Sequence, residues 1–220
     1  MNKNFKCVIF DLDGTLIDSG PDLIDSLNYV LKSENYDSIS NSVIGNLVGG
    51  GAEAMIRKGF KYLQKDLPKE KISYLIKNFL EFYSKNCTRK TKLYPDVYDL
   101  LVFLKNKKTK ICLCTNKKQY LAEKILENLN IIDLFDYKIG SQDGFLLKPN
   151  TQMPLKCLEN VTCDANQAIF VGDSNNDMIP ANTLGMKSVF VSYGYGKESD
   201  IDKSDYIIDN IMDLKDIIFN

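Results

Sequence analysis

A short apolar run that ends in two closely spaced aspartates constrains this chain more than any other part of its sequence. Residues 7–10 (Cys-Val-Ile-Phe) have the length and apolar character of a strand buried on both faces. Asp11 and Asp13 follow, and because side chains alternate along an extended chain, both carboxylates can point the same way beyond the strand. Gly14 permits a sharp turn and a close approach of backbone to a ligand. Because two converging carboxylates repel each other, the arrangement favours a bound cation, and hard oxygen ligands suit Mg²⁺.

The periodicity of the chain changes near residue 90. Before it, helical spacing of apolar residues runs over 21–31, 40–63 and 68–86, without a strand pattern. After it, strands are expected over 109–115, 135–140, 167–172, 187–192 and 205–208, separated or followed by helices over 96–105, 118–129, 151–160, 176–184 and 211–218. This alternation predicts an α/β fold with a Rossmann-like parallel sheet and helices on both faces. We expect a core domain formed by residues 1–17 and 91–220, interrupted by an all-helical domain over 18–90.

Composition excludes several classes of protein. A net charge of −1 gives no electrostatic reason to bind nucleic acid or an anionic membrane. The absence of histidine excludes histidine acid–base chemistry and His-ligated zinc. No apolar run could span a bilayer, and the N-terminus lacks the apolar region of a signal peptide. Three of the six cysteines fall in expected buried strands, where they act as small apolar residues. We expect a reduced, cytoplasmic protein, either a monomer or a homodimer.

Polar side chains recur where the later strands end, which is where parallel sheets bind their ligands. Thr115 and Asn116 end one strand, Lys148 lies before Pro149 after the next, and residues 172–177 (Gly-Asp-Ser-Asn-Asn-Asp) end a third. Each segment has an ordinary explanation when taken alone. The first could cap a helix, the lysine could lie on the surface, and the third could be a turn between strand and helix. Asp11 and Asp13 could likewise be solvated acids in an Asx turn.

Residues 11–19 (Asp-Leu-Asp-Gly-Thr-Leu-Ile-Asp-Ser) resemble the first motif of the haloacid dehalogenase-like superfamily in its phosphatase form. The three later segments occur in the order of that superfamily's other motifs and at successive strand ends. The ordinary explanations given for the single segments do not account for this shared order and placement. The resemblance implies the fold of that superfamily, and it implies that the helical insert is the superfamily's small cap domain.

The resemblance further implies a magnesium-dependent phosphomonoester hydrolase that forms an aspartyl-phosphate. Asp11 would be the nucleophile and Asp13 the general acid and base; haloacid dehalogenases lack an acid at the second position. Mg²⁺ would bind the carboxylates of Asp11 and Asp173 and the carbonyl of Asp13. The implied phosphate-binding residues are Thr115, Asn116, Lys148 and Gly14, and the implied supporting residues are Ser174 and Asp177, of which Asp177 would orient Lys148 or a metal-bound water.

A glycine-rich stretch in the helical insert bears on the substrate, which we expect to be a small phosphorylated metabolite. Gly49, Gly50 and Gly51 fall at an expected helix start, where backbone N–H groups attract anions, and Arg57 could add a positive charge. A flexible turn explains the glycines equally well. This stretch and residues 191–196 (Val-Ser-Tyr-Gly-Tyr-Gly) resemble bacterial phosphoglycolate phosphatases, which implies 2-phosphoglycolate as substrate. The alternatives are enzymes of the same fold, namely another small-molecule phosphatase, a pyrophosphatase or a sugar phosphomutase. A further alternative is a non-catalytic sensor of phosphorylated ligands.

Overall fold

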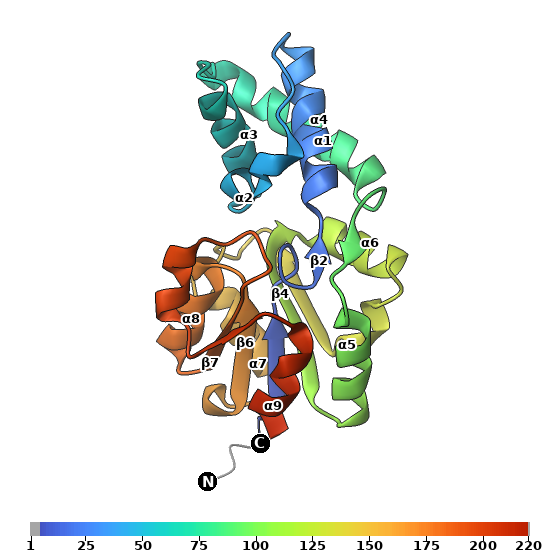
Figure 1. Cartoon of the computed structure of the whole chain (residues 1–220), viewed down its shortest axis with the longest axis vertical. Helices are drawn as coiled ribbons and strands as arrows, with labels where there is room; N and C mark the ends of the chain where they lie inside the picture. The colour runs from blue at the N-terminus through green and yellow to red at the C-terminus, as the bar shows by residue number, and fades with distance from the viewer. Residues whose placement is uncertain (1–4, 220) are drawn as a thin grey trace. The chain divides into compact units, whose positions relative to one another are not determined.

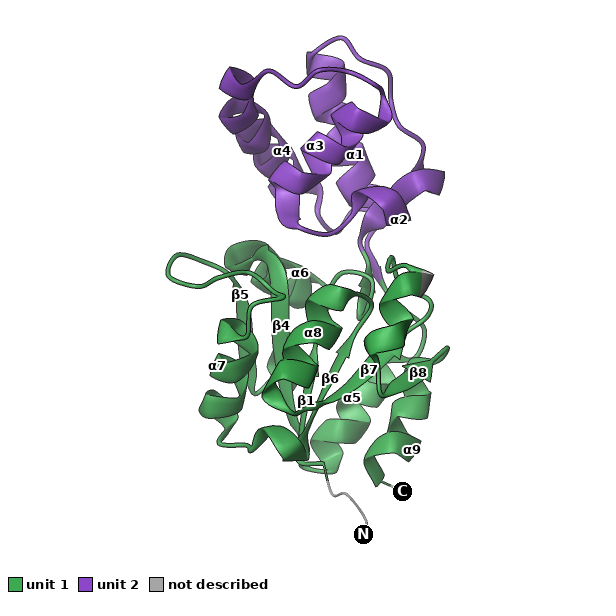
Figure 2. Cartoon of the chain, turned by 90° about the vertical axis from the view of Figure 1, so that its left-hand side faces the viewer, with its two compact units in different colours: residues 1–18, 93–220 green, residues 19–92 purple. Residues whose placement is uncertain are grey.

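The computed structural model describes residues 5–219, which form two compact units (Figure 1). Unit 1 combines the chain up to Asp18 with the chain from Leu93 onward, and unit 2 is the continuous segment Ser19–Lys92 (Figure 2). Among the described residues, no helix combines the length and the apolar character that crossing a membrane requires.

A six-stranded parallel sheet forms the centre of unit 1, with its strands in the order β5-β4-β1-β6-β7-β8. The strands are β1 (Cys7–Phe10), β4 (Lys110–Lys118), β5 (Tyr137–Ser141), β6 (Ala168–Gly172), β7 (Lys187–Val191) and β8 (Tyr206–Ile208). All four residues of β1 are buried because this strand lies between β4 and β6, with helices on both faces. The predicted α/β fold with a parallel sheet is confirmed.

Helices cover both faces of this sheet (Figures 1 and 2). They are α5 (Val97–Asn106), α6 (Gln119–Asn128), α7 (Gln152–Val161), α8 (Asn175–Leu184) and α9 (Leu214–Phe219). On one face, Cys7 and Cys112 of the sheet pack in a buried cluster with Cys157 of α7 and Ala181 of α8. Helices α5 and α9 lie over the opposite face. The cysteines in the predicted strands are buried, as expected, and all six cysteines are free thiols.

Unit 2 is helical, with α1 (Gly20–Ser33), α2 (Ile44–Leu47), α3 (Gly51–Tyr62) and α4 (Ile72–Asn86). Leu27 of α1, Phe60 of α3 and Phe79 of α4 are among its buried apolar side chains. The buried carboxylate of Asp22, in the first turn of α1, accepts hydrogen bonds from the backbone N–H of Thr91 at 2.9 Å and its hydroxyl at 2.8 Å. This contact joins the beginning of the unit to its end.

Two features of the fold were not predicted from the sequence. The two-residue strands β2 (Ile17–Asp18) and β3 (Lys92–Leu93) form a separate two-stranded sheet. Strand β4 continues to Lys118, three residues beyond its expected end, and its register with β5 shifts between Cys114 and Lys118. This irregular end of β4 contains Thr115, Asn116 and Lys117, which belong to the candidate active site described below.

Candidate active site

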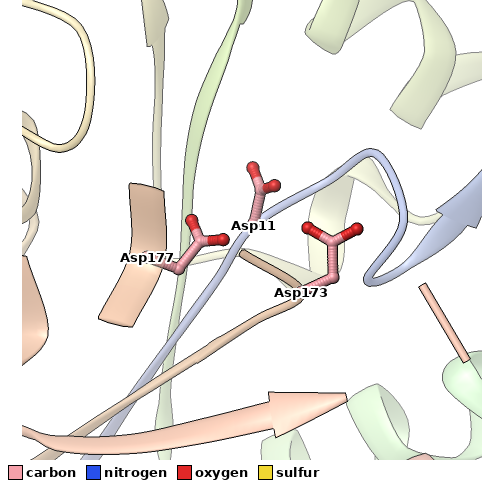
Figure 3. A group of neighbouring side chains, drawn as sticks. All are labelled: Asp11, Asp173 and Asp177. Atoms are coloured by element: carbon pink, nitrogen blue, oxygen red, sulfur yellow. The ribbon is translucent and has the colours of Figure 1, made fainter. Parts of the chain in front are cut away.

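Asp11 lies at the carboxyl edge of the sheet, directly after β1. Its backbone N–H donates to the carbonyl of Val171 at 2.9 Å, which extends the pairing of β1 with β6 by one residue. Asp173 follows Val171 by two residues and therefore reaches the same edge. Figure 3 shows the carboxylates of Asp11, Asp173 and Asp177 next to one another, and one oxygen of each lies within 4.8 Å of the other two.

The ammonium group of Lys148 joins two of these carboxylates. Its Nζ lies 2.9 Å from Oδ1 of Asp11 and 2.6 Å from Oδ1 of Asp177. The Lys148 side chain is only 1% exposed, so this charge is held inside the protein by its carboxylate partners. Burial alone would lower the pKa of Lys148, but Asp11 and Asp177 raise that pKa above its usual range, so the side chain stays charged.

The amide of Asn116 fixes the backbone from which Lys148 projects. Its Nδ2 donates to the carbonyl of Lys148 and its Oδ1 accepts from the N–H of Lys148, both at 2.8 Å. In the structure this amide pairs with the main chain of Lys148 as a neighbouring strand would; the phosphate contact expected for Asn116 stays a prediction. The sequence could not reveal this pairing because the two residues are 32 positions apart.

Asp177 belongs to the start of α8 as well as to the lysine pair. Ser174 precedes the helix, and Oδ2 of Asp177 accepts from the backbone N–H of Ser174 at 3.2 Å and from its hydroxyl at 3.1 Å. The hydroxyl oxygen of Ser174 in turn accepts from the backbone N–H of Asn176 at 3.3 Å, so the helix start has a capping box, which satisfies backbone N–H groups there. Both oxygens of Asp177 therefore have partners within the protein, one from α8 and one from Lys148.

The Asp173 side chain lies against two backbone segments, at Gly14 and Gly194, where a residue with a Cβ atom would overlap it. Its Oδ2 accepts a hydrogen bond from the N–H of Tyr195 at 2.7 Å. A Cβ atom on Gly14 would overlap Oδ2 of Asp173, and one on Gly194 would overlap the Asp173 Cβ. The N–H of Gly14 donates to the carbonyl of Ile17 at 2.9 Å, and the phosphate contact expected for Gly14 stays a prediction. In the structure, Gly14 thus provides space for Asp173 at a φ of +84°.

The cluster carries more negative charge than its single lysine offsets. Burial raises the pKa of Asp11 from 3.8 to about 6, against the lowering effect of Lys148. Burial also raises the pKa of Asp173 well above its usual value, and the neighbouring Asp177 and Asp11 add to this rise. A divalent cation between Asp11 and Asp173 would remove the repulsion, and carboxylate oxygens are the ligands that Mg²⁺ prefers. The donor set therefore fits a hard divalent metal.

The side chain of Asp13 makes a separate ion pair. Its Oδ1 lies 2.9 Å from Nζ of Lys117, and the two side chains are 17% and 5% exposed. The buried hydroxyl of Thr115 accepts a hydrogen bond from the backbone N–H of Lys117 at 3.1 Å. Sequence reasoning missed Lys117, although it follows Thr115 and Asn116 directly, because a lysine near a strand end is ordinarily exposed.

Comparison with known proteins identifies the family. The sequence model of the haloacid dehalogenase-like hydrolases matches residues 8–191. This range contains the site residues Asp11, Asp13, Thr115, Lys148 and Asp173. The chain belongs to the haloacid dehalogenase-like hydrolases.

Relatives of this hydrolase extend over nearly its whole length. It is 32% identical to a phosphoglycolate phosphatase of Agrobacterium fabrum over 213 residues, 96% of this chain and 91% of the relative. It is 31% identical to a phosphoglycolate phosphatase of Caulobacter vibrioides over 89% of this chain and 82% of the relative. A crystal structure of a predicted phosphoglycolate phosphatase from Haemophilus somnus superposes with a TM-score of 0.90, at 31% identity, covering 97% of this chain and 98% of that one. This haloacid dehalogenase-like hydrolase is a phosphatase enzyme.

The glycine-rich stretch of unit 2 forms the entry to α3 in this hydrolase. Gly49, Gly50 and Gly51 all have positive φ angles, and α3 begins at Gly51. The guanidinium of Arg57 lies 2.8 Å from the carboxylate of Glu53, one turn earlier on the same exposed face. Lys58 donates to the carbonyl of Val48 at 2.9 Å and so holds the loop against the helix.

Proposed function

We propose that this hydrolase is a magnesium-dependent phosphomonoesterase that forms an aspartyl-phosphate on Asp11 and acts on 2-phosphoglycolate. The observation that carries the proposal is the buried cluster in which the Asp11 carboxylate lies beside that of Asp173 and the ammonium of Lys148. A nucleophile, a metal-binding carboxylate and a cation for the phosphate oxygens are the parts that phosphoryl transfer requires.

Asp11 is the proposed nucleophile because its carboxylate stands at the sheet edge, where Lys148 restrains it and disfavours its protonation. An Asp11 oxygen would form a bond to phosphorus while the bond from phosphorus to the leaving oxygen breaks. Asp13 would give its proton to that oxygen and later take one from the water that hydrolyses the aspartyl-phosphate. We also assign Lys148 and the hydroxyl of Thr115 to the phosphate oxygens.

We assign metal binding to the carboxylates of Asp11 and Asp173 and to the main-chain carbonyl of Asp13. Asp177 is a weaker ligand candidate, because its two oxygens already accept hydrogen bonds from Lys148 and Ser174. Bound Mg²⁺ would offset the charge that develops on the transferred phosphoryl group. The remaining role of Asp177 is then to hold Lys148, and that of Asn116 is to hold the lysine's backbone.

The substrate assignment rests on the relatives, which are named phosphoglycolate phosphatases. We propose that unit 2 is a cap domain that selects the part of the substrate beyond its phosphate, and that the loop from Gly49 to Gly51 receives the glycolate carboxylate with help from Arg57. The positive φ angles of these glycines and the following start of α3 are compatible with an anion site on the backbone. The six free thiols support our further proposal of a cytoplasmic location.

A panel of phosphorylated metabolites, including 2-phosphoglycolate, sugar phosphates and pyrophosphate, tests the substrate and the reaction together. We expect turnover that EDTA abolishes and Mg²⁺ restores, with the highest kcat/KM for 2-phosphoglycolate. Acid quenching should trap phosphate on the wild-type chain in a form that hydroxylamine releases, and Asp11→Asn should trap none. Preference for pyrophosphate, or a phosphoenzyme that persists until a sugar phosphate is added, would overturn the assignment in favour of a pyrophosphatase or a mutase.

A further inference from the structure

Lys117 is a buried cation that the steps above leave without a role. Its side chain is 5% exposed, and its Nζ lies 2.9 Å from Oδ1 of Asp13. Burying an ammonium group costs desolvation free energy, which only paired carboxylates and hydrogen bonds offset. A lysine at this position therefore depends on its pairing with Asp13. The second cation of the sheet edge, Lys148, contacts Asp11 and Asp177. Each aspartate of the Asp-Leu-Asp motif is therefore paired with a lysine of its own.

The backbone at Lys117 is held tightly, so its side chain starts from a fixed point. The N–H of Lys117 donates to the hydroxyl of Thr115 at 3.1 Å. Its carbonyl faces β5 so closely that a Cβ on Gly140 would come within 2.7 Å of the carbonyl oxygen. The shifted register of β4 between Cys114 and Lys118 is the local irregularity that contains this residue. Lys117 is thus anchored from two sides.

From this geometry we propose that Lys117 is a positioning residue, which orients the Asp13 carboxyl group for proton transfer to the leaving oxygen. The inference rests on the proposed function, because it assigns a task within that reaction. The proton moves from Asp13 to the leaving oxygen as the bond from phosphorus to that oxygen breaks, and Lys117 neither gains nor loses a proton. Fixing the donor matters because misplacement by about 1 Å can cost on the order of 100-fold in rate.

The dependence of kcat/KM on the leaving group separates this role from a structural one. For an enzyme that releases its alcohol before water attacks, kcat/KM reports only the steps up to the aspartyl-phosphate. An alkyl leaving group, as in 2-phosphoglycolate or ethyl phosphate, needs the proton of Asp13. A 4-nitrophenolate leaves without it. Loss of a positioned acid should therefore slow the alkyl esters selectively.

The experiment compares wild type with Lys117→Met, Asp13→Asn and the double variant, on 2-phosphoglycolate, ethyl phosphate and 4-nitrophenyl phosphate. We expect Lys117→Met to lower kcat/KM about 100-fold for both alkyl esters and to leave the aryl ester within about threefold of wild type. The double variant should match Asp13→Asn alone, because Lys117 acts through Asp13. Lys118→Met, which removes an exposed lysine from the next position of β4, is the matched control and should keep wild-type values.

Each other outcome overturns the proposal in a recognisable way. An equal loss on all three esters would mean that Lys117 supports the fold or binds phosphate. A loss on 2-phosphoglycolate but not ethyl phosphate would mean that it binds the substrate carboxylate. Lys117→Gln, which keeps a hydrogen-bond donor without the charge, gives the same comparison if the methionine variant does not fold. Absence of turnover by the wild-type chain would overturn the proposed function itself, whereas unchanged ester ratios in the Lys117 variants would overturn only the positioning role.

Discussion

The carboxylate of Asp173 occupies the space that a side chain at Gly14 would need. A Cβ on Gly14 would overlap Oδ2 of Asp173 and would approach its Cγ to 2.9 Å. The two residues lie 159 positions apart in the sequence and belong to different motifs, one after β1 and the other after β6. The glycine of the first motif thus leaves the space that the aspartate of the last motif occupies.

Gly14→Ala should displace Asp173 and weaken the proposed metal site. We expect a fall in kcat of about 100-fold at fixed Mg²⁺, since the added methyl would shift the carboxylate by about 1 Å. Part of the effect should be relieved by more Mg²⁺, so the variant is assayed over a metal titration.

A second glycine in unit 1 offers a matched control for Gly14→Ala. Gly144 has a φ of +89°, close to the +84° of Gly14, but a Cβ there would meet nothing within 4 Å. Both alanine variants should lose about 1–2 kcal/mol from the left-handed backbone alone. If Gly144→Ala lowered metal-dependent activity as much as Gly14→Ala, backbone strain would explain the loss and the contact with Asp173 would not matter.

The raised pKa of Asp11 predicts how stability without metal depends on pH. Burial raises this pKa from 3.8 to about 6, so the folded state binds a proton more tightly than the unfolded state. The resulting stability is fully present below pH 3.8 and is lost as the pH rises through about 6. In EDTA, wild type should therefore lose up to about 3 kcal/mol relative to Asp11→Asn between pH 4 and pH 7.

Urea unfolding of both proteins at several pH values measures this difference. Saturating Mg²⁺ is the control, because a cation beside Asp11 favours the ionised carboxylate and should flatten the pH dependence. A difference between wild type and Asp11→Asn that stays constant from pH 4 to pH 7 in EDTA would show that burial does not hold Asp11 in the protonated form.

Asn116→Ala should act through Lys148. Removal of the two hydrogen bonds to the lysine's main chain should destabilise the protein by about 1–3 kcal/mol and lower kcat about tenfold. Asn160→Ala is the control, since this exposed side chain donates to a carbonyl of its own helix. The opposite pattern, with stability unchanged and inhibition by inorganic phosphate weakened, would favour the direct phosphate contact predicted for Asn116.

The sheet could be predicted from the sequence because the patterns that indicate its strands involve residues close together in the chain. The apolar run of β1 and the alternation after residue 90 depend only on neighbours in the chain, and they predict buried parallel strands correctly. The convergence of Asp11 and Asp173 follows from the same rule, because parallel strands carry their carboxyl ends to one edge.

Contacts between distant segments were not predictable in the same way. The amide of Asn116 bonds the main chain of Lys148, and Gly14 leaves space for the Asp173 carboxylate. Neither contact follows from the sequence, because each joins residues far apart in the chain. Lys117 was missed because its burial depends on β4 continuing past Thr115, against the close backbone of β5. The short strands β2 and β3 lack any periodicity, since each has two residues.

The pairing of β2 with β3 has an evolutionary consequence. Asp18 and Leu93, the last and first residues of unit 1 on either side of unit 2, lie on these two neighbouring strands. An inserted segment whose two attachment points are adjacent can be lengthened, shortened or exchanged without re-threading the parallel sheet. With unit 2 acting as the cap domain that we propose, lineages can alter the inserted segment while they inherit one unaltered set of reactive groups.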